Sequence, residues 1–324
     1  MMTIKARNVN DAYVNGLWWL KTSGQQEQSR NGEVIVSPEP VMTVYSSPQE
    51  RVLLDSARDA NPFFHLYEAI WMLAGARDVR KVAHYASNML SYSDDGETLN
   101  GAYGDRWRNY YDVDQLLEIV DMLRTDITTR RAVLAMWNGF EDLCSESKDI
   151  PCNTHIYFRM HPGRTLDTTV CCRSNDVIWG AYGANAVHFS VLHEFMARAV
   201  GATPGKLYQF SNNYHIYEPH WKLMRAPALE MNPYDNPIFR AIPLFAQQDE
   251  YILFLKGCEE IAATGHNTRD VPFLRNVVMH MLDAWEAHKD KDAQRAYTSL
   301  SRMPDCDWQV AGMRWIDRHE KVTG

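Results

Sequence analysis

The sequence predicts an α+β fold in which a mixed, largely antiparallel β-sheet is flanked by helices. Stretches with apolar residues at helical spacing stand beside short segments that are apolar or alternate between apolar and polar residues. Their order is not the regular alternation of a parallel sheet, and the chain has neither a G-x-G-x-x-G motif nor a P-loop. With 324 residues, 45% hydrophobic and 23% charged, the composition is that of a globular protein.

Helical periodicity first occurs at residues 62–75 (PFFHLYEAIWMLAG), which predict a buried helix ending at Gly75. Residues 115–124 predict a second, amphipathic helix. A long helix is expected over residues 184–201, where a glycine again marks the end. From about residue 273 onward the chain is expected to be mostly helical.

The predicted strands are shorter and have a different pattern. Residues 131–137 (RAVLAMW), 154–160 (THIYFRM) and 166–173 (LDTTVCCR) are apolar or alternating, and 207–217 (LYQFSNNYHIY) returns to strand. The sequence HPGR at 161–164 predicts a hairpin turn between the second and third strands. We expect a main domain over residues 1–264 and a helical C-terminal extension, residues 265–324, packed on the same domain.

Composition and cysteine spacing exclude several classes of protein. The six cysteines form no C-x-x-C pair, and the adjacent Cys171 and Cys172 would point to opposite faces of a strand. We therefore expect free thiols in a reducing compartment and no metal site. The net charge of −8 argues against a general nucleic-acid binder. No apolar run is long enough for a membrane helix and none resembles a signal peptide, so a cytoplasmic location is expected.

Four segments together indicate chemistry. Each one alone would be unremarkable, since a lone cysteine is usually a small buried hydrophobic residue and an arginine pair is usually a solvated face. Their order and spacing are much harder to dismiss. They are Arg130-Arg131 before VLAMWN, Pro151-Cys152-Asn153, Arg173-Ser174-Asn175-Asp176 with Gly180 and Asn185, and the stretch from Asn213 to Tyr217.

On these segments, from roughly Arg30 to Tyr217, the sequence resembles the superfamily of thymidylate synthases and deoxypyrimidine-monophosphate hydroxymethylases. The matching motifs are RRAVLAMWN, PCN, RSNDVIWG and YHIY, with EAIWMLAG and GAYGDRWR upstream. The resemblance implies that fold for residues 1–264. It also implies a homodimer and 5,10-methylenetetrahydrofolate as co-substrate.

The resemblance makes Cys152 the nucleophile. Carbon 5 of a pyrimidine reacts poorly, but addition of a thiolate to carbon 6 converts the ring into an enolate that can attack a one-carbon iminium. The thiol must be ionised, and nearby cations favour ionisation. Arg173 is expected to assist in this and also to bind the substrate phosphate.

Further roles come from the same resemblance. Phosphate binding is expected from several forked guanidinium groups and a hydroxyl. These are Arg30, Arg130, Arg131, Arg173 and Ser174, of which the pair Arg130 and Arg131 reaches across from the other subunit. The pyrimidine edge and the sugar hydroxyl are expected to contact Asn185, His215 and Tyr217.

An amide at Asn185 can donate to one ring atom and accept from another, which suits uracil. Hydroxymethylases that take cytosine nucleotides tend to carry aspartate there, so Asn185 favours dUMP. Glu68 is expected to organise water and relay protons around the ring carbonyl. Tyr103 would assist removal of the proton from carbon 5. Asp176 would contact the pterin ring, with Tyr92 as a further aromatic residue on the folate side.

Departures from thymidylate synthases favour the hydroxymethylase branch. Asn153 stands where synthases usually have histidine, Asn175 is larger than the usual residue, and SYSDDGETLN replaces a tryptophan-rich stretch. The helical extension also lacks the short apolar tail that closes over the folate in synthases. Because the two reactions differ in whether water reaches an exocyclic methylene, we expect conversion of dUMP to 5-hydroxymethyl-dUMP. This chemistry would suit a phage enzyme acting in the cytosol of an infected bacterium.

Other readings remain open. A thymidylate synthase would make dTMP and dihydrofolate, and a dCMP hydroxymethylase would take the other base. A nucleotide-binding protein without chemistry would not need the thiol of Cys152. An unrelated thiol enzyme could pair Cys152 with His155 or His188, but those positions fit packing roles on a strand and a core-facing helix.

Overall fold

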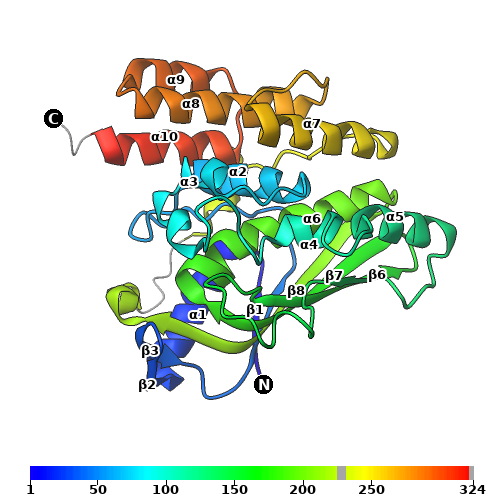
Figure 1. Cartoon of the computed structure of the whole chain (residues 1–324). Coiled ribbons are helices and arrows are strands. Elements are labelled where there is room, and N and C mark those ends of the chain that lie inside the picture. Colours follow the sequence, from blue (N-terminus) through cyan, green and yellow to red (C-terminus); the bar gives the residue numbers. More distant parts are fainter. Residues whose placement is uncertain (225–230, 321–324) are drawn as a thin grey trace.

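A mixed eight-stranded sheet lies at the centre of the molecule (Figure 1). The computed structural model describes residues 1–224 and 231–320. The main path of the sheet runs β1-β4-β8-β7-β6-β5, and the β2–β3 hairpin pairs with the end of β8. The β1–β4 and β7–β8 pairs are parallel and the others are antiparallel, which confirms the predicted mixed sheet. The strands are β1 Met2–Ala6, β2 Gln25–Ser29, β3 Gly32–Val36, β4 Val41–Tyr45, β5 Val133–Ala135, β6 Asn153–His161, β7 Thr165–Asp176 and β8 Thr203–Tyr217.

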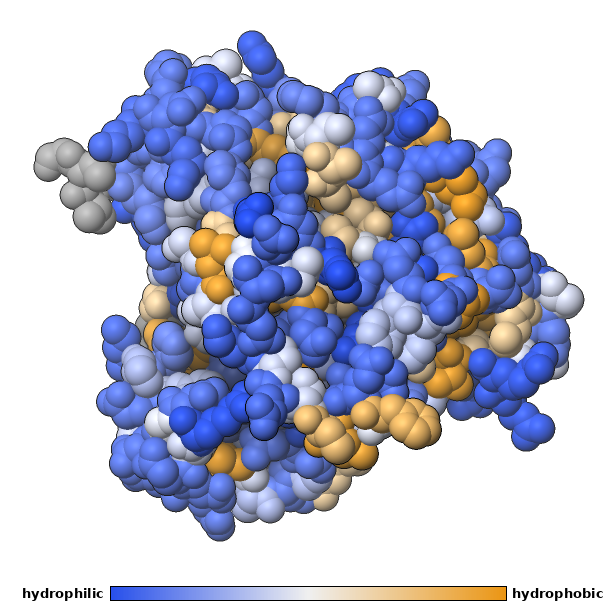
Figure 2. Space-filling model, in the orientation of Figure 1, coloured by the Kyte–Doolittle hydropathy of each residue, from blue (hydrophilic) through white to orange (hydrophobic). Residues whose placement is uncertain are grey.

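Helices cover one face of this sheet in two layers (Figure 1). The inner layer contains α2 Pro62–Leu73, α4 Tyr103–Arg108, α5 Gln115–Thr125 and α6 Asn185–Ala199. The outer layer contains α7 Tyr251–Thr264, α8 Met279–Lys289, α9 Ala293–Ser301 and α10 Asp307–Glu320. Helix α1 Val9–Ser23 follows β1, and α3 Val79–Ala83 lies beside α2. Most of the face seen in Figure 2 is hydrophilic.

Helix α2 has no solvent-facing side. Asn61 caps its first turn by accepting from the amide of Phe64 at 3.0 Å, and Pro62 occupies the first position. All residues of the helix are buried, because α6 packs on one side and α7, α8 and α10 on the other. The Phe63 ring lies 5.6 Å from Trp285 and 5.5 Å from Trp315. The helical C-terminal region therefore completes the core around α2.

The β6–β7 hairpin forms where the sequence predicts it. His161 pairs with Thr165, and the turn between them uses left-handed backbone at Gly163 and Arg164 (φ +86° and +60°). At the other end of the hairpin, Cys171 is partly exposed and Cys172 is buried, as strand alternation requires.

Several boundaries differ from the sequence prediction. The strand expected at 131–137 is only Val133–Ala135, because it is an edge strand that pairs with β6 alone. The helix expected from residue 184 begins at Asn185, after the π-helical segment Val177–Ala184 with its kink at Gly183. Residues 321–324 of the expected extension lie outside the described part of the chain. Within that part, no helix is long and apolar enough to cross a membrane.

Candidate active site

The thiol of Cys152 sits directly before strand β6, on a loop that Arg173 holds in place. The Arg173 amide donates to the Cys152 carbonyl at 2.8 Å. Its guanidinium donates to the carbonyls of Pro151 and Ile150 at 2.9 and 3.0 Å. The residue expected to activate the thiol thus also fixes the backbone that presents it.

The charges around Cys152 act in opposite directions. Burial raises the pKa of the Cys152 thiol, and the Asp149 carboxylate raises it further. The guanidinium groups of Arg173 and Arg30 lower it. Arg30, in the turn between β2 and β3, therefore lies within electrostatic reach of the thiol, although only a short sequence context supported it.

Tyr103, at the start of α4, lies beside Cys152. Its hydroxyl oxygen accepts from the Asn153 amide at 3.3 Å, and its ring stacks on Phe189 at 6.0 Å. Burial, with a smaller contribution from Cys152, holds the pKa of Tyr103 well above its usual value. The phenol is therefore a neutral hydroxyl next to the thiol.

Glu68 projects from α2 and meets His188 from α6. Their Oε2 and Nε2 atoms are 3.0 Å apart, and both side chains are buried. The angles are not those of a hydrogen bond, and neither atom has another hydrogen-bond partner among the described residues. A carboxyl and an imidazole thus meet without solvent contact.

Three polar side chains form a hydrogen-bonded series at the start of α6. The Asn185 amide nitrogen donates to Asn175 Oδ1 at 3.2 Å, and the Asn175 amide nitrogen donates to Ser211 Oγ at 3.0 Å. All three residues are buried. The series fixes the orientation of the Asn185 amide and leaves its oxygen unused by the protein side chains described.

Asp176 ends strand β7 and caps the π-helical segment that follows it. Its Oδ1 accepts from the amides of Ile178 and Trp179 at 3.0 and 2.6 Å. Its Oδ2 is buried without a partner among the described residues. Burial raises the pKa of Asp176 to about 6. Oδ1 has a structural role as the cap, and the backbone amide of Tyr217 acts on the same carboxyl group by lowering its pKa.

The remaining expected residues lie around the end of β8. His215 and Tyr217 form an edge-to-face pair with ring centroids 5.1 Å apart, and the Tyr217 hydroxyl accepts from Asn31 at 3.5 Å. Ser174 is opposite Asn213 in the β7–β8 register. Burial, followed by the nearby Tyr217 and Asp176, raises the pKa of Tyr92. These side chains therefore share one region with Cys152 and Asp176.

Arg130 and Arg131 are not part of this cluster. Both are exposed and precede the edge strand β5. Because Val133 pairs with Tyr157, Arg131 lies near Arg159. That position is seven residues along β6 from Cys152, which corresponds to roughly 20 Å. The arginine pair cannot serve the thiol of its own subunit.

Residues 11–252 match the sequence profile of the family described as Thymidylate synthase. The chain belongs to the thymidylate synthase family.

The chain is also similar in sequence to individual members of the family, over different shares of their length. The chain is 43% identical to a protein named Deoxyuridylate hydroxymethyltransferase from Pseudomonas phage M6, over 98% of this chain and 94% of that protein. It is 36% identical to a protein of the same name from Bacillus phage SP01, over 57% and 51% of the two chains. A Putative thymidylate synthase from Methanosarcina barkeri is 27% identical over 68% of this chain and 92% of the relative.

One residue of this family site was missed by sequence reasoning. Asp149 precedes Cys152 by three positions, and its Oδ2 accepts from the Gly101 amide at 2.8 Å. Burial raises its pKa, and the nearby Glu68 raises it further. An acidic residue three positions before the expected nucleophile was the available signal, but it lay outside the family motifs.

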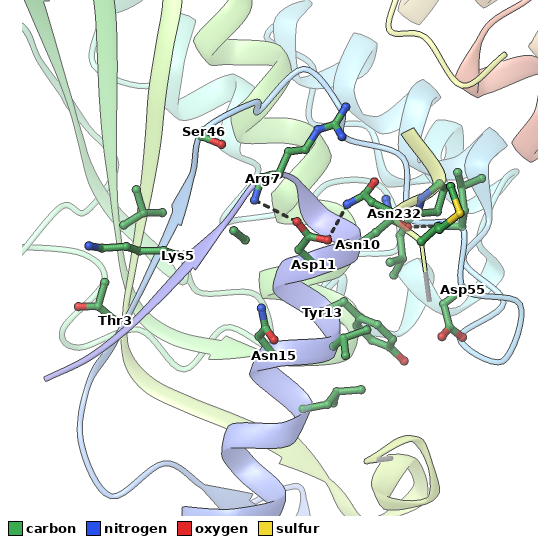
Figure 3. A pocket seen from close by; sticks show the side chains of 18 of the residues that line it. Thr3, Lys5, Arg7, Asn10, Asp11, Tyr13, Asn15, Ser46, Asp55 and Asn232 are labelled. Atoms are coloured by element: carbon green, nitrogen blue, oxygen red, sulfur yellow. Dashed lines mark hydrogen bonds between the residues drawn. The ribbon is translucent and has the colours of Figure 1, made fainter. Parts of the chain in front are cut away.

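A cavity of about 1110 Å³ lies elsewhere, between α1 and the strands β1, β4 and β8. Lys5, Asn10 and Tyr13 are among the side chains that line it (Figure 3). It does not include Cys152 or any other expected site residue, so the chemistry of this family site is not assigned to it. Among the described residues there is no group of histidine, cysteine and acidic side chains that could hold a metal ion.

Proposed function

We propose that the protein converts dUMP to 5-hydroxymethyl-dUMP, with 5,10-methylenetetrahydrofolate as the one-carbon donor. The observation that carries this proposal is the 43% identity, over almost the whole of both chains, to a phage protein named Deoxyuridylate hydroxymethyltransferase. The arrangement around Cys152 suits the same chemistry. The substrates and the phage relative both favour a reaction in the cytosol of an infected bacterium.

In this proposal, the Cys152 thiolate adds to carbon 6 of the pyrimidine, and carbon 5 then takes up the one-carbon unit. Tyr103 lies next to the thiol and assists removal of the carbon 5 proton. Loss of that proton would break the bond between the one-carbon unit and the folate nitrogen, so that tetrahydrofolate leaves and an exocyclic methylene remains. Water adds to this methylene, and Cys152 leaves. Glu68 manages protons at the ring carbonyl from the buried side of the site.

Recognition of uracil is assigned to Asn185. Because its amide nitrogen donates to Asn175, its second N–H can donate to O4 of uracil and its oxygen can accept from N3–H. Cytosine presents the opposite pattern at these two atoms. The Asn175–Ser211 hydrogen bond supports the orientation that matches uracil. His215 and Tyr217 are assigned to the sugar hydroxyl.

The phosphate is assigned to arginines from two subunits. Arg173, Arg30 and Ser174 lie on the same side as Cys152, whereas Arg130 and Arg131 lie roughly 20 Å along the sheet. They can complete a site only in a second copy of the chain. The sheet face without a helical layer, where Tyr157 and Val133 are 43% and 37% exposed, is a suitable surface for a homodimer.

The folate fits the residues that remain. The unpaired buried Oδ2 of Asp176 matches an N–H donor of a pterin, and Tyr92 offers a half-exposed ring nearby. The bound folate supplies the one-carbon unit. We also assign residues 1–264 to the catalytic domain, with the helices from residue 265 onward supporting α2 from behind.

The test is product analysis by mass spectrometry after incubation with methylenetetrahydrofolate and either dUMP or dCMP. The proposal predicts a hydroxymethyl product from dUMP and recovery of tetrahydrofolate. A methyl product with dihydrofolate would instead establish a thymidylate synthase. Hydroxymethylation of dCMP in preference to dUMP would overturn the assignment of Asn185.

A further inference from the structure

We infer that His188 is a positioning residue for the hydration step, holding the Glu68 carboxylate and taking over the proton that Glu68 receives from the attacking water. The inference rests on the proposed hydroxymethylation. It assigns a chemical role to a buried histidine that lies outside the family motifs and that the sequence pattern fitted only to packing.

The geometry puts this imidazole in contact with Glu68 and with no other acid. His188 Nε2 is 3.0 Å from Glu68 Oε2, and the exposed fractions of the two side chains are 1% and 7%. His188 Nδ1 has no hydrogen-bond partner among the described residues. The buried histidine His193 on the same helix also has unpaired ring nitrogens but no carboxylate contact among the described residues, so the contact with Glu68 is what distinguishes His188.

The surroundings restrict where a proton can go. His65 lies on the same face of α2 as Glu68, three positions earlier, and burial holds its pKa well below the usual value. The charges of Arg58 and His188 lower it further. Asp149 also lies within electrostatic reach of Glu68, and its carboxylate is anchored by a hydrogen bond that it accepts from the Gly101 amide. Glu68 is therefore the group through which His188 can exchange a proton with the active site.

The position beside the nucleophile supplies no imidazole in this chain. Asn153 follows Cys152, and its amide nitrogen is engaged by the Cys171 carbonyl at 2.8 Å. An amide can donate and accept hydrogen bonds but cannot take up a proton at neutral pH. Helix α6 brings His188 to Glu68 from another direction, so a titratable ring is available on the Glu68 side of the ring carbonyl.

The oxygen of water bonds to the exocyclic methylene carbon, and the pair of electrons of that double bond moves through carbon 5 onto the ring carbonyl. The proton released by the water passes to Glu68 and then to His188. The enolate then reforms the C5–C6 double bond and expels the Cys152 thiolate, and the proton returns from His188 through Glu68 to the active site, where it can neutralise the thiolate.

The experiment compares two rates in dUMP labelled with tritium at carbon 5. The rate of tritium release measures how fast the exocyclic methylene intermediate forms. The rate of 5-hydroxymethyl-dUMP formation measures how fast water adds to that intermediate. Added 2-mercaptoethanol reacts with any exocyclic methylene intermediate that accumulates because the addition of water is slow, and the product is a thioether. H188Q keeps an N–H that can face Glu68 but cannot carry a proton, and H188N is a second variant if H188Q does not fold. H193Q is the matched control, since His193 is another buried histidine of α6.

We expect H188Q to slow hydroxymethyl formation by at least about tenfold, to change tritium release by less than about threefold, and to yield a thioether product. H193Q should leave the ratio of the two rates unchanged. An unchanged ratio in H188Q, or an equal loss in both rates, would overturn the inference. So would a full H188Q effect in an E68Q background, because His188 would then act independently of Glu68. Failure of the proposed function can be distinguished from failure of this inference by the product of the wild-type protein. If the proposed function is wrong, wild type would release tritium but form a methyl product.

Discussion

The ionisation of Cys152 depends on charges that make no hydrogen bond to its sulfur. Arg173 and Arg30 lower the pKa of the thiol, whereas burial and Asp149 raise it. The net direction is upward, so the free protein holds the thiol mostly protonated at neutral pH. Substrate phosphate would occupy the arginines and remove part of their effect. Asp149 is therefore the residue whose removal should most directly favour the thiolate.

We predict that D149N raises the rate of Cys152 alkylation by iodoacetamide about threefold at pH 7.5, which corresponds to a fall of about half a pKa unit. Asparagine can still accept from the Gly101 amide, so the loop should be preserved. Alkylation rates across pH 6 to 10 provide the measurement. The C152A variant measures how much iodoacetamide reacts with the other cysteines, and this background is subtracted. A slower reaction in D149N would contradict the assigned sign.

Base selection is predicted to depend on the side-chain amide of Asn185. N185D should lower kcat/KM for dUMP by at least about 100-fold and raise it for dCMP, because a protonated carboxyl can match N3 and N4 of cytosine. Steady-state rates with both nucleotides test this. N212D, at an exposed position of strand β8, controls for the added charge. Retained dUMP preference in N185D would show that other groups read the base.

Family motifs predicted the residues around Cys152 but not their supporting contacts. Tyr103, Asp176, Asn185 and His215 belong to the motifs that the sequence analysis singled out, and the fold brings the segments that carry these motifs to one end of strands β7 and β8. The Asn175–Ser211 hydrogen bond and the Glu68–His188 contact join segments far apart in sequence. Side-chain pairings of that kind are determined by the packing of α6 on α2 and by the β7–β8 register, which residue patterns do not specify.

Among the secondary-structure elements, those with one exposed face were the easiest to predict. Helix α5 and the β6–β7 hairpin have clear alternation of buried and exposed residues. The short strands β1 to β4 and helix α1 were not predicted. Strands β3 and β4 pair with β8, which is more than 150 residues away in the sequence, as the pairing of Val41 with Ser211 shows, and β1 and β2 join the sheet through β4 and β3. The long apolar runs of α2 and α6 were recognised, although their burial on all sides depends on later helices.

The start of α10 contains a buried carboxyl that should make stability depend on pH. Asp307 accepts from the Tyr234 hydroxyl at 2.9 Å and from the Trp308 amide. Burial raises its pKa to about 7. A carboxyl pKa that is higher in the folded state means that the folded protein binds the proton more tightly. Its contribution to stability is therefore full below about pH 4 and is lost as pH rises through 7.

We predict that wild type loses about 2 kcal/mol of unfolding free energy between pH 5 and pH 8 that D307N does not lose. Urea unfolding at both pH values measures the difference between the two proteins, which cancels the other titrating groups they share. D305N, on an exposed neighbour, should behave as wild type. Equal pH dependence in D307N and wild type would mean that Asp307 remains ionised in the folded protein.

For the whole molecule, the position of the arginine pair predicts shared active sites. C152A and the R130A/R131A variant should each be inactive alone. After unfolding and refolding as an equal mixture, activity should return to about a quarter of wild type, because half of the dimers are mixed and each has one complete site. If each subunit used its own arginines, no mixture of the two variants would regain activity. Light scattering should give the mass of two chains.

The burial of α2 has a consequence for the order in which the protein can form during translation. Residues 62–73 leave the ribosome long before the helices at 279–320 that pack behind them. Until then, Phe63 and its neighbours expose an apolar surface that no earlier segment covers, and Glu68 is held from only one side. A nascent chain can therefore contain Cys152 and the whole sheet and still lack a rigidly held Glu68 carboxylate. The packing around α2 is completed late, when the last helices emerge, and this interval is when chaperones would be needed most.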